Sequence, residues 1–171
     1  MEVIVKFTAA TTQKDLLAIH NLAPELWQYA YENILSAAQI DYMLEWMYSI
    51  KKLNENIENG TNFFLIEVNG NNYGFIALTP DKENCSTVIL DKLYLHKNFH
   101  GMGIGQKALN FACTWAKEKN FTQIELHVNK RNLRGQKAYI RNGFTILRSE
   151  VNNIGNNFVM DDFIMGKKLQ D

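Results

Sequence analysis

The stretch His100-Gly101-Met102-Gly103-Ile104-Gly105-Gln106 decides how the whole chain is interpreted. It lies between an apolar run that ends at Leu95 and an amphipathic segment, 103–119, and so predicts a turn from a strand into a helix. Three glycines let the backbone turn with its NH groups exposed, and the start of a helix adds unpaired NH groups and a positive dipole end. Such a turn can hold a phosphate group, although a tight packing turn has the same glycines.

Two common phosphate-binding motifs do not fit this stretch. A Walker loop requires Lys and then Ser or Thr after its last glycine, whereas Gly105 is followed by Gln106 and Lys107. A dinucleotide fingerprint requires its third glycine one residue later than Gly105, even though Glu125 lies at a suitable distance for the acidic partner. The glycines therefore indicate either a phosphate site of another kind or a plain turn.

Hydrophobic periodicity predicts strands and helices on both sides of the turn. Strands are expected at residues 3–7, 63–68, 73–78, 88–95 and 124–128, with two more within 144–169 that join near 152–157. Helices are expected from Thr12, from Ser36 to near Asn56, at 103–119 and at 132–142. Pro24 is expected to interrupt the first helix, because proline lacks a backbone NH and clashes with the preceding turn. This order predicts an α/β (α+β) fold in which helices flank a mixed sheet and helix 103–119 joins two parallel strands.

The composition indicates a single domain over residues 1–171. Eighteen basic and eighteen acidic side chains cancel, which argues against a nucleic-acid or membrane partner. No apolar window is long enough to span a membrane, and residues 1–7 lack the layout of a signal peptide, so a cytoplasmic location is expected. Cys85 and Cys113 are expected to be free thiols, and the histidines show no metal-ligand spacing, so no metal is expected.

The segment 91–105 resembles the acetyl-CoA site of the GNAT family of N-acetyltransferases. The family signature has Gln or Arg, two residues, Gly, one residue, and then Gly or Ala. Here Gly103 and Gly105 match this pattern, whereas His100 departs from it at the first position. The resemblance implies that the departure weakens the pyrophosphate contact that this position makes in the family.

The second half of the signature follows at the expected distance. Asn132, Tyr139 and Gly143-Phe144 resemble the family's Asn, Tyr and Gly-Phe series, with Gly135 where alanine is more common. The C-terminal run 155–165 is similar to the end of a bacterial branch that includes polyamine acetyltransferases, although buried sheet residues would give the same pattern. Two half-motifs in register make the resemblance specific.

The resemblance implies the GNAT fold, a central mixed and mostly antiparallel sheet of about seven strands flanked by about four helices. It implies acetyl-CoA as co-substrate and a primary amine, polyamine-like, as acceptor. In this fold the strand ending near Leu95 and the strand 124–128 separate, and the pantetheine arm lies between them. The coenzyme contacts implied by position are Leu93, Tyr94, Leu95, His100, Gly101, Met102, Gly103, Ile104, Gly105, Gln106, Asn132 and Tyr139.

Acetyl transfer to an amine sets requirements on the site. Attack on the thioester passes through an oxyanion, so the site needs an NH donor, an acid for the leaving thiolate and a base for the amine proton. We expect Tyr139 to be the general acid, because a phenol is protonated at neutral pH and can protonate the departing sulfur. The alternative is that Tyr139 only packs or hydrogen-bonds at the coenzyme tail.

The general base is less defined by the sequence. Strand alternation places Asp91 on the same face as Leu93 and Leu95, from where it could reach the amine through water. Glu125 and His127 on the neighbouring strand form an alternative pair. A third interpretation has all three as solvated strand residues.

Acidic and aromatic side chains interleave in the two early helices, where the family builds its acceptor pocket. They suit a cationic amine, but an ordinary amphipathic helix pair has the same pattern. They are Glu25, Glu32, Asp41 and Glu45, with Trp27, Tyr29, Tyr31, Tyr42, Trp46 and Tyr48. Two other functions stay open, acetylation of a protein or peptide amine and non-catalytic acyl-CoA sensing. Dimers are common in the family, and the C-terminal hairpin is the expected contact in a homodimer.

Overall fold

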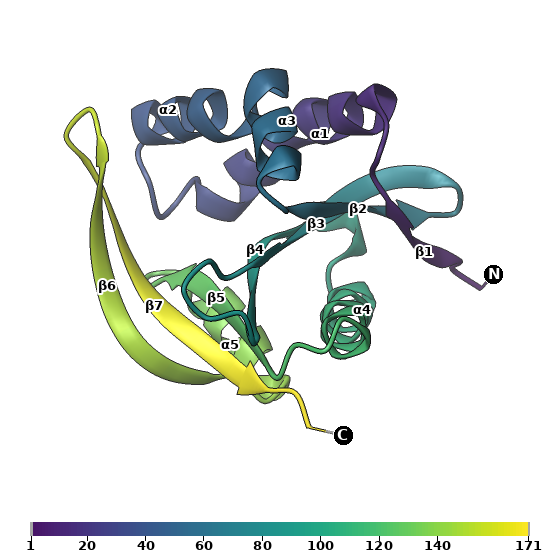
Figure 1. Cartoon of the computed structure of the whole chain (residues 1–171). Helices are drawn as coiled ribbons and strands as arrows, with labels where there is room; N and C mark the ends of the chain where they lie inside the picture. Colours follow the sequence, from purple (N-terminus) through teal and green to yellow (C-terminus); the bar gives the residue numbers. More distant parts are fainter. Residues whose placement is uncertain (1, 171) are drawn as a thin grey trace.

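The computed structural model describes residues 2–170 of the chain. Its elements alternate along the sequence much as the periodicity predicts, and Figure 1 shows their arrangement. In chain order they are β1 (Val5–Ala9), α1 (Gln13–Tyr31), α2 (Ala37–Tyr48), α3 (Ile50–Glu58), β2 (Asn62–Val68), β3 (Asn71–Pro80), β4 (Thr87–Leu95), a short 3-10 helix (Lys97–Phe99), α4 (Ile104–Glu118), β5 (Gln123–Asn129), α5 (Leu133–Arg141), β6 (Thr145–Gly155) and β7 (Phe158–Lys168).

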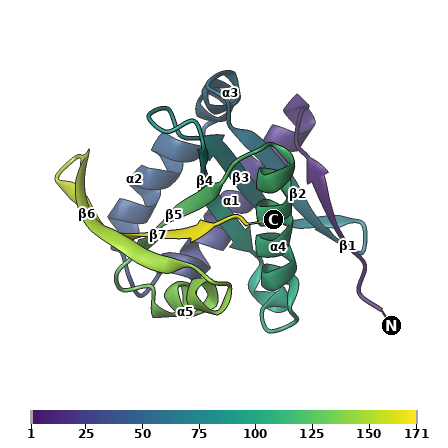
Figure 2. The same cartoon turned by 60° about the horizontal axis from the view of Figure 1, so that its bottom comes forward.

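One seven-stranded sheet runs through the molecule in the order β1-β2-β3-β4-β5-β7-β6. All neighbouring strands are antiparallel except β4 and β5, which are parallel and are joined through α4. Helices α1, α2 and α3 cover one face, while α4 and α5 lie on the other (Figures 1 and 2). The predicted mixed, mostly antiparallel sheet with flanking helices is confirmed. Within residues 2–170, no helix has the length and apolarity that a bilayer crossing requires.

A β-bulge in β4 sits next to the point where the sheet opens. Strand β4 pairs with β5 only from Thr87 to Leu90, but it pairs with β3 as far as Leu95. On the β3 side the register slips between Ala77 and Leu78, which leaves Asp91 as the extra residue of a bulge. The last part of β4 therefore diverges from β5 while β3 still holds it in place.

Helix α1 continues through Pro24, so the predicted interruption there is wrong. Proline removes the hydrogen bond to the carbonyl of His20, but Pro24 and His20 both lie on the exposed side, where water can hydrate that carbonyl. Buried residues on either side of the proline, among them Ile19 and Trp27, hold the helix against the sheet. The free energy gained by packing this buried face outweighs the cost of the hydrogen bond that is lost at Pro24.

The second predicted helix, from Ser36 to near Asn56, is divided in the structure into α2 and α3. Ser49 separates them with an extended backbone, φ −60° and ψ 147°, and its hydroxyl accepts a hydrogen bond from the Lys52 NH at 3.2 Å. A serine that caps the following helix competes with continuation of the preceding one. Residues 2–170 thus form five α-helices, one more than predicted.

Gly74 in β3 provides a test of how tightly the end of β4 is held. A Cβ at this position would overlap the Tyr94 carbonyl oxygen and lie 3.2 Å from the Leu95 Cα, and both obstacles are backbone. We expect Gly74→Ala to lower the free energy of unfolding by about 2 kcal/mol, because the strands must move apart. Chemical denaturation measures this change.

Gly105→Ala is the matched control for that substitution. Gly105 lies in the first turn of α4, and a Cβ there would meet nothing within 4 Å. Alanine has the higher helix propensity, so this variant should be as stable as the parent chain or more stable. Equal stability of Gly74→Ala and the parent chain would contradict the close approach of β3 and β4.

Candidate active site

The opening between β4 and β5 is the centre of the candidate site. From Asp91 to Leu95, β4 has no strand partner on its β5 side among the described residues, and this confirms the predicted separation. The side chains of Leu93 and Leu95 are partly buried against the core beneath α4, and their peptide groups on the β5 side are left without a strand partner among the described residues. Tyr94 points the other way, toward α1. An extended ligand can therefore pair with the exposed backbone of β4.

The glycine turn lies at the end of β4, between the 3-10 helix and α4. Gly101 and Gly103 have φ of 79° and 76°, which is left-handed backbone that favours glycine. Gly103 is the N-cap of α4 and provides no side-chain cap, so the NH groups of the first turn stay available. A Cβ on Gly101, Gly103 or Gly105 would meet nothing within 4 Å. The turn has both the donors and the open space that a diphosphate needs.

The other members of this turn differ in what they offer. Ile104 is 1% exposed and packs into the core, so only its NH faces the turn. Met102 is exposed. Gln106 donates from its side-chain amide to the Asn110 and Asn142 side-chain oxygens, which ties the start of α4 to the end of α5. The amide of Gln106 therefore serves the structure of the turn.

His100 is held by two hydrogen bonds that define its tautomer. Its Nε2 lies 2.7 Å from the Leu95 carbonyl oxygen, which can only accept, so Nε2 carries the proton. Its Nδ1 then accepts from the Arg134 Nη2 at 2.6 Å. Partial burial lowers the pKa of His100, and the Arg134 guanidinium lowers it further, so the ring is neutral at pH 7.

Arg134 is a site residue that the sequence analysis missed. It lies in the first turn of α5, where its guanidinium reaches both His100 and, at 3.2 Å, the Tyr29 hydroxyl. The sequence offers only a weak signal for it, namely its position two residues after Asn132. A positive charge is thereby placed beside the position at which the signature has Gln or Arg.

Asn132 has a defined structural role at the start of α5. It is the N-cap of this helix, and its Oδ1 accepts from the Gly135 NH at 2.9 Å. A Cβ on residue 135 would lie 2.7 Å from the Asn132 Nδ2, so glycine permits this close packing. The cap fixes the first turn of α5, which carries Arg134, and the direction of the helix that carries Tyr139.

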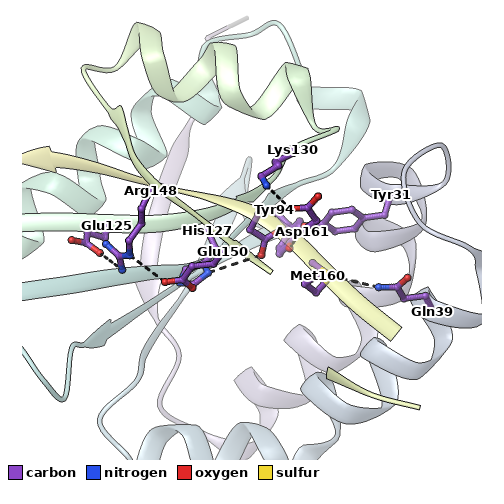
Figure 3. Close-up of polar contacts among 11 residues, drawn as sticks. Tyr31, Gln39, Tyr94, Glu125, His127, Lys130, Arg148, Glu150, Met160 and Asp161 are labelled. Atoms are coloured by element: carbon purple, nitrogen blue, oxygen red, sulfur yellow. Dashed lines mark hydrogen bonds and ion pairs between the residues drawn. The ribbon is translucent and has the colours of Figure 1, made fainter. Parts of the chain in front are cut away.

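Three tyrosines from elements that are distant in the sequence lie within electrostatic range of one another. The hydroxyls of Tyr31 in α1 and Tyr94 in β4 lie 2.8 Å apart. Figure 3 shows these two side chains next to each other. Tyr139 comes from α5 on the other face of the sheet, with its ring 5.9 Å from that of Phe144. Burial raises the pKa of Tyr139, and the Tyr31 phenol raises it further, so Tyr139 is protonated at neutral pH.

Asp91 does not share a face with Leu93 and Leu95, because the bulge breaks the strand alternation on which that prediction depends. Its Oδ2 accepts a hydrogen bond from the Thr79 hydroxyl, which places the carboxylate on the side of α1. The residue is exposed, but the surrounding protein atoms partly desolvate its carboxyl group. This desolvation raises the pKa of Asp91, and the Thr79 bond opposes the rise.

Glu125 and His127 occupy the same face of β5 but differ in their partners. Glu125 accepts from the Gln123 side chain at 2.6 Å, and its other oxygen lies 3.5 Å from the Arg148 guanidinium. His127 is half exposed, and its Nδ1 lies 4.0 Å from the Asp162 Oδ2. Figure 3 shows Glu125, Arg148 and His127. Glu125 thus has a hydrogen-bond donor and a cation beside it, whereas the described residues give His127 no ion-pair partner closer than Asp162.

The acidic residues of the early helices separate into two groups. Glu25 and Glu32 line a groove of about 290 Å³ between α1 and the end of β4, and Glu25 pairs with His96 Nε2 at 2.9 Å. Asp41 and Glu45 lie exposed on α2 and do not line this groove. Of the aromatic residues, Trp27 and Tyr48 form a buried hydrogen bond of 2.8 Å in the core. Within residues 2–170, no three His, Cys, Asp or Glu side chains cluster closely enough to hold a metal ion.

Comparisons with known proteins agree with this geometry. The family described as the acetyltransferase (GNAT) family matches residues 18–144. The spermidine N(1)-acetyltransferase of Thermoplasma acidophilum is 28% identical over 162 residues, which are 92% of this chain and 93% of that protein. The solved structure of the PaiA N-acetyltransferase of Thermoplasma acidophilum in complex with coenzyme A has a TM-score of 0.79 at 26% identity, covering 98% of this chain and 99% of that one.

A more distant structure shows the fold alone. An acetyltransferase of the GNAT family from Staphylococcus aureus has a TM-score of 0.71 at 17% identity, covering 98% of this chain and 100% of that chain. The family match spans most of the sequence and contains the glycine turn, the open part of β4 and the helix of Tyr139. The chain therefore belongs to the acetyltransferase (GNAT) family.

Proposed function

We propose that this chain transfers the acetyl group of acetyl-CoA to a primary amine of a small, polyamine-like cation. The observation that carries the proposal is the opening between β4 and β5, with the uncapped glycine turn at one end and the tyrosine cluster of Tyr31, Tyr94 and Tyr139 beside it. The name of the Thermoplasma acidophilum relative supports the choice of acceptor, because that protein is a spermidine acetyltransferase.

The proposed coenzyme contacts follow from the shape of the opening. The NH groups from Gly101 to Gln106 hold the pyrophosphate, and Arg134 adds the positive charge that His100, as a neutral ring, does not supply. The peptide groups of Leu93, Tyr94 and Leu95 pair with the pantetheine arm. Asn132 keeps its cap bond through Oδ1 and has Nδ2 free to donate to the coenzyme.

The proposed chemistry uses two groups with raised pKa values. Tyr139, which is protonated at neutral pH, donates its proton to the departing thiolate sulfur. Asp91 accepts the amine proton, directly or through water, and the desolvation that raises its pKa makes it a stronger base than an ordinary carboxylate. Peptide NH groups of β4 are the candidate donors to the oxyanion.

Replacing Tyr139 by Phe tests the acid. The variant keeps the buried ring but loses the proton donor, so we expect kcat to fall about 100-fold while the acetyl-CoA Kd changes by less than about threefold. Steady-state kinetics and calorimetry measure the two quantities. Tyr73→Phe, on a tyrosine that packs against Phe99, is the matched control and should keep the parent kcat. An unchanged kcat for Tyr139→Phe would remove Tyr139 from this role.

The pH dependence of kcat/KM tests the base. Asp91 must be ionised to accept a proton, so kcat/KM should rise with pH through the raised pKa of Asp91, and Asp91→Asn should abolish that acidic limb. Thr79→Val removes the hydrogen bond that lowers this pKa, so it should move the limb to higher pH. If the pH profile of kcat/KM for Asp91→Asn matches that of the parent chain, Asp91 is not the base, and His127 or water would accept the amine proton instead.

Release of free coenzyme A separates the proposed enzyme from its alternatives. Aliphatic polyamines, a peptide with a free amine and no acceptor would be compared at equal acetyl-CoA concentration. We expect fast release only with polyamines. Preference for the peptide would indicate a protein acetyltransferase, and tight coenzyme binding without release would indicate a sensor. Failure of both acetyl-CoA and coenzyme A to bind would overturn the whole proposal.

The C-terminal hairpin supports a proposed self-association. Strand β6 is an edge of the sheet, and it exposes Ile146, Leu147 and Val151, the last of which is 66% exposed. A long edge strand with apolar side chains is a surface that proteins usually cover. Sedimentation velocity should show a dimer for the parent chain and a monomer for Val151→Asp. A monomeric parent chain would exclude this contact.

A further inference from the structure

Asp162 is a buried carboxylate that the mechanism above does not use. It lies in β7, it is 5% exposed, and its Oδ1 has no hydrogen-bond partner in the described chain. Its Oδ2 lies 4.0 Å from the His127 Nδ1, which is beyond hydrogen-bond distance. An unpaired buried carboxylate costs several kcal/mol, so a fold keeps one mainly where a ligand or a reaction uses it.

Strand register places Asp162 beside the opening. It pairs with Asn129 at the end of β5, beyond the point at which β5 has parted from β4. Phe163 and Met165, which are on the other face of β7 from Asp162, pack into the core beneath α4. Asp162 therefore faces the opposite side, toward α1 and α2.

Helix α2 and the loop before it close this side of the sheet. The Gln39 side chain donates to the Val159 carbonyl at 3.0 Å, and the Tyr42 hydroxyl donates to the Ile154 carbonyl at 2.8 Å. Arg131 donates to the carbonyls of Asn33 and Ile34 in the loop between α1 and α2. Figure 3 shows Tyr31, Tyr94 and Gln39 around this part of β7. Asp162 thus lies on the face of β7 that these contacts border, within electrostatic range of Tyr31.

Neighbouring cations are occupied by other carboxylates. Lys130 pairs with Asp161, and Arg148 bridges Glu150 at 3.1 Å and Glu125 at 3.5 Å. Burial raises the pKa of Asp162 most strongly, and the charges of Asp161 and Glu150 add to the rise, while His127 and Lys130 oppose it. Neither of these two cations therefore pairs with Asp162.

Tyr31 connects this carboxylate to the proposed acid. The charge of Asp162 contributes to the raised pKa of Tyr31, and Tyr31 in turn contributes to that of Tyr139. Both groups therefore lie within electrostatic range of one phenol. A ligand with two separated nitrogens can place one nitrogen at Asp162 and the other near Tyr139.

We propose that Asp162 binds the non-reacting ammonium group of a diamine or polyamine, while the reacting nitrogen lies near Tyr139. The assignment rests on the proposed acetyl transfer and specifies its acceptor class. The ammonium donates to the vacant Oδ1, and the rings of Tyr31 and Tyr94 provide aromatic faces for the cation. Asp162 is in this view the residue that selects acceptors with two cationic ends.

Diaminobutane and butylamine test the assignment, because they differ only in the second nitrogen. For the parent chain we expect a clear preference for diaminobutane. Asp162→Asn should lower kcat/KM for diaminobutane about 30-fold and leave butylamine within about twofold, so that the preference disappears. Asp161→Asn makes the same change on the adjacent exposed carboxylate and should keep the preference.

Thermal unfolding shows whether a lower activity of Asp162→Asn results from a less stable fold. Removal of an unpaired buried charge should leave the Tm of Asp162→Asn equal to or above that of the parent chain. If Asp162→Asn keeps the parent preference for diaminobutane, the assignment is overturned and the acetyl transfer stands. Equal losses for both amines, or a strongly lowered Tm, would likewise reject it in favour of a structural role. If no amine is acetylated by the parent chain, the proposed function itself fails.

Discussion

The early end of pairing between β4 and β5 is the constraint on which the site depends. Parallel pairing stops at Leu90, and the bulge at Asp91 turns the rest of β4 away from β5. Within residues 2–170, the peptide groups of β4 that face β5 after this point lack a strand partner, which is costly when they are shielded from water and useful when a ligand can pair with them. The glycine turn, α5 and the inner face of β7 all border this opening, so one defect in the sheet organises every group with a proposed role.

Two hydrophobic cores hold the opening in shape, one on each face of the sheet. Beneath α4, the side chains of Leu93 and Leu95 anchor the free part of β4. On the other face, Tyr94 packs against Trp27 and Phe75, with ring centroids 5.7 Å apart in both pairs. Because successive side chains of β4 pack into opposite cores, this strand is held in place even where it no longer pairs with β5. The structure can therefore keep an unpaired edge without collapse of the cleft.

The sequence predicted the local features and missed those that depend on register. The glycine turn, helix α4 and the order of the strands follow from short-range patterns, and all are present. The bulge at Asp91 depends on how β4 pairs with β3. The break at Ser49 depends on whether this serine caps α3 or continues α2. Neither outcome is visible in one segment of the sequence. Asp161 and Asp162 are adjacent and chemically identical, and only the register of β7 decides that one is exposed and the other buried.

Groups of opposite charge preference border the opening between β4 and β5, although the chain as a whole has a formal net charge of zero. At the glycine turn, the start of α4 and the guanidinium of Arg134 favour an anion. On the α1 and α2 side of β7, the proposed cation site is formed by the buried Asp162 carboxylate and the Tyr31 and Tyr94 rings. In the proposed function, the anionic coenzyme and the cationic amine would therefore each be attracted to a different group of side chains. Because charges attract most strongly over a few ångströms between partly buried groups, this selection needs no excess of charge on the protein surface.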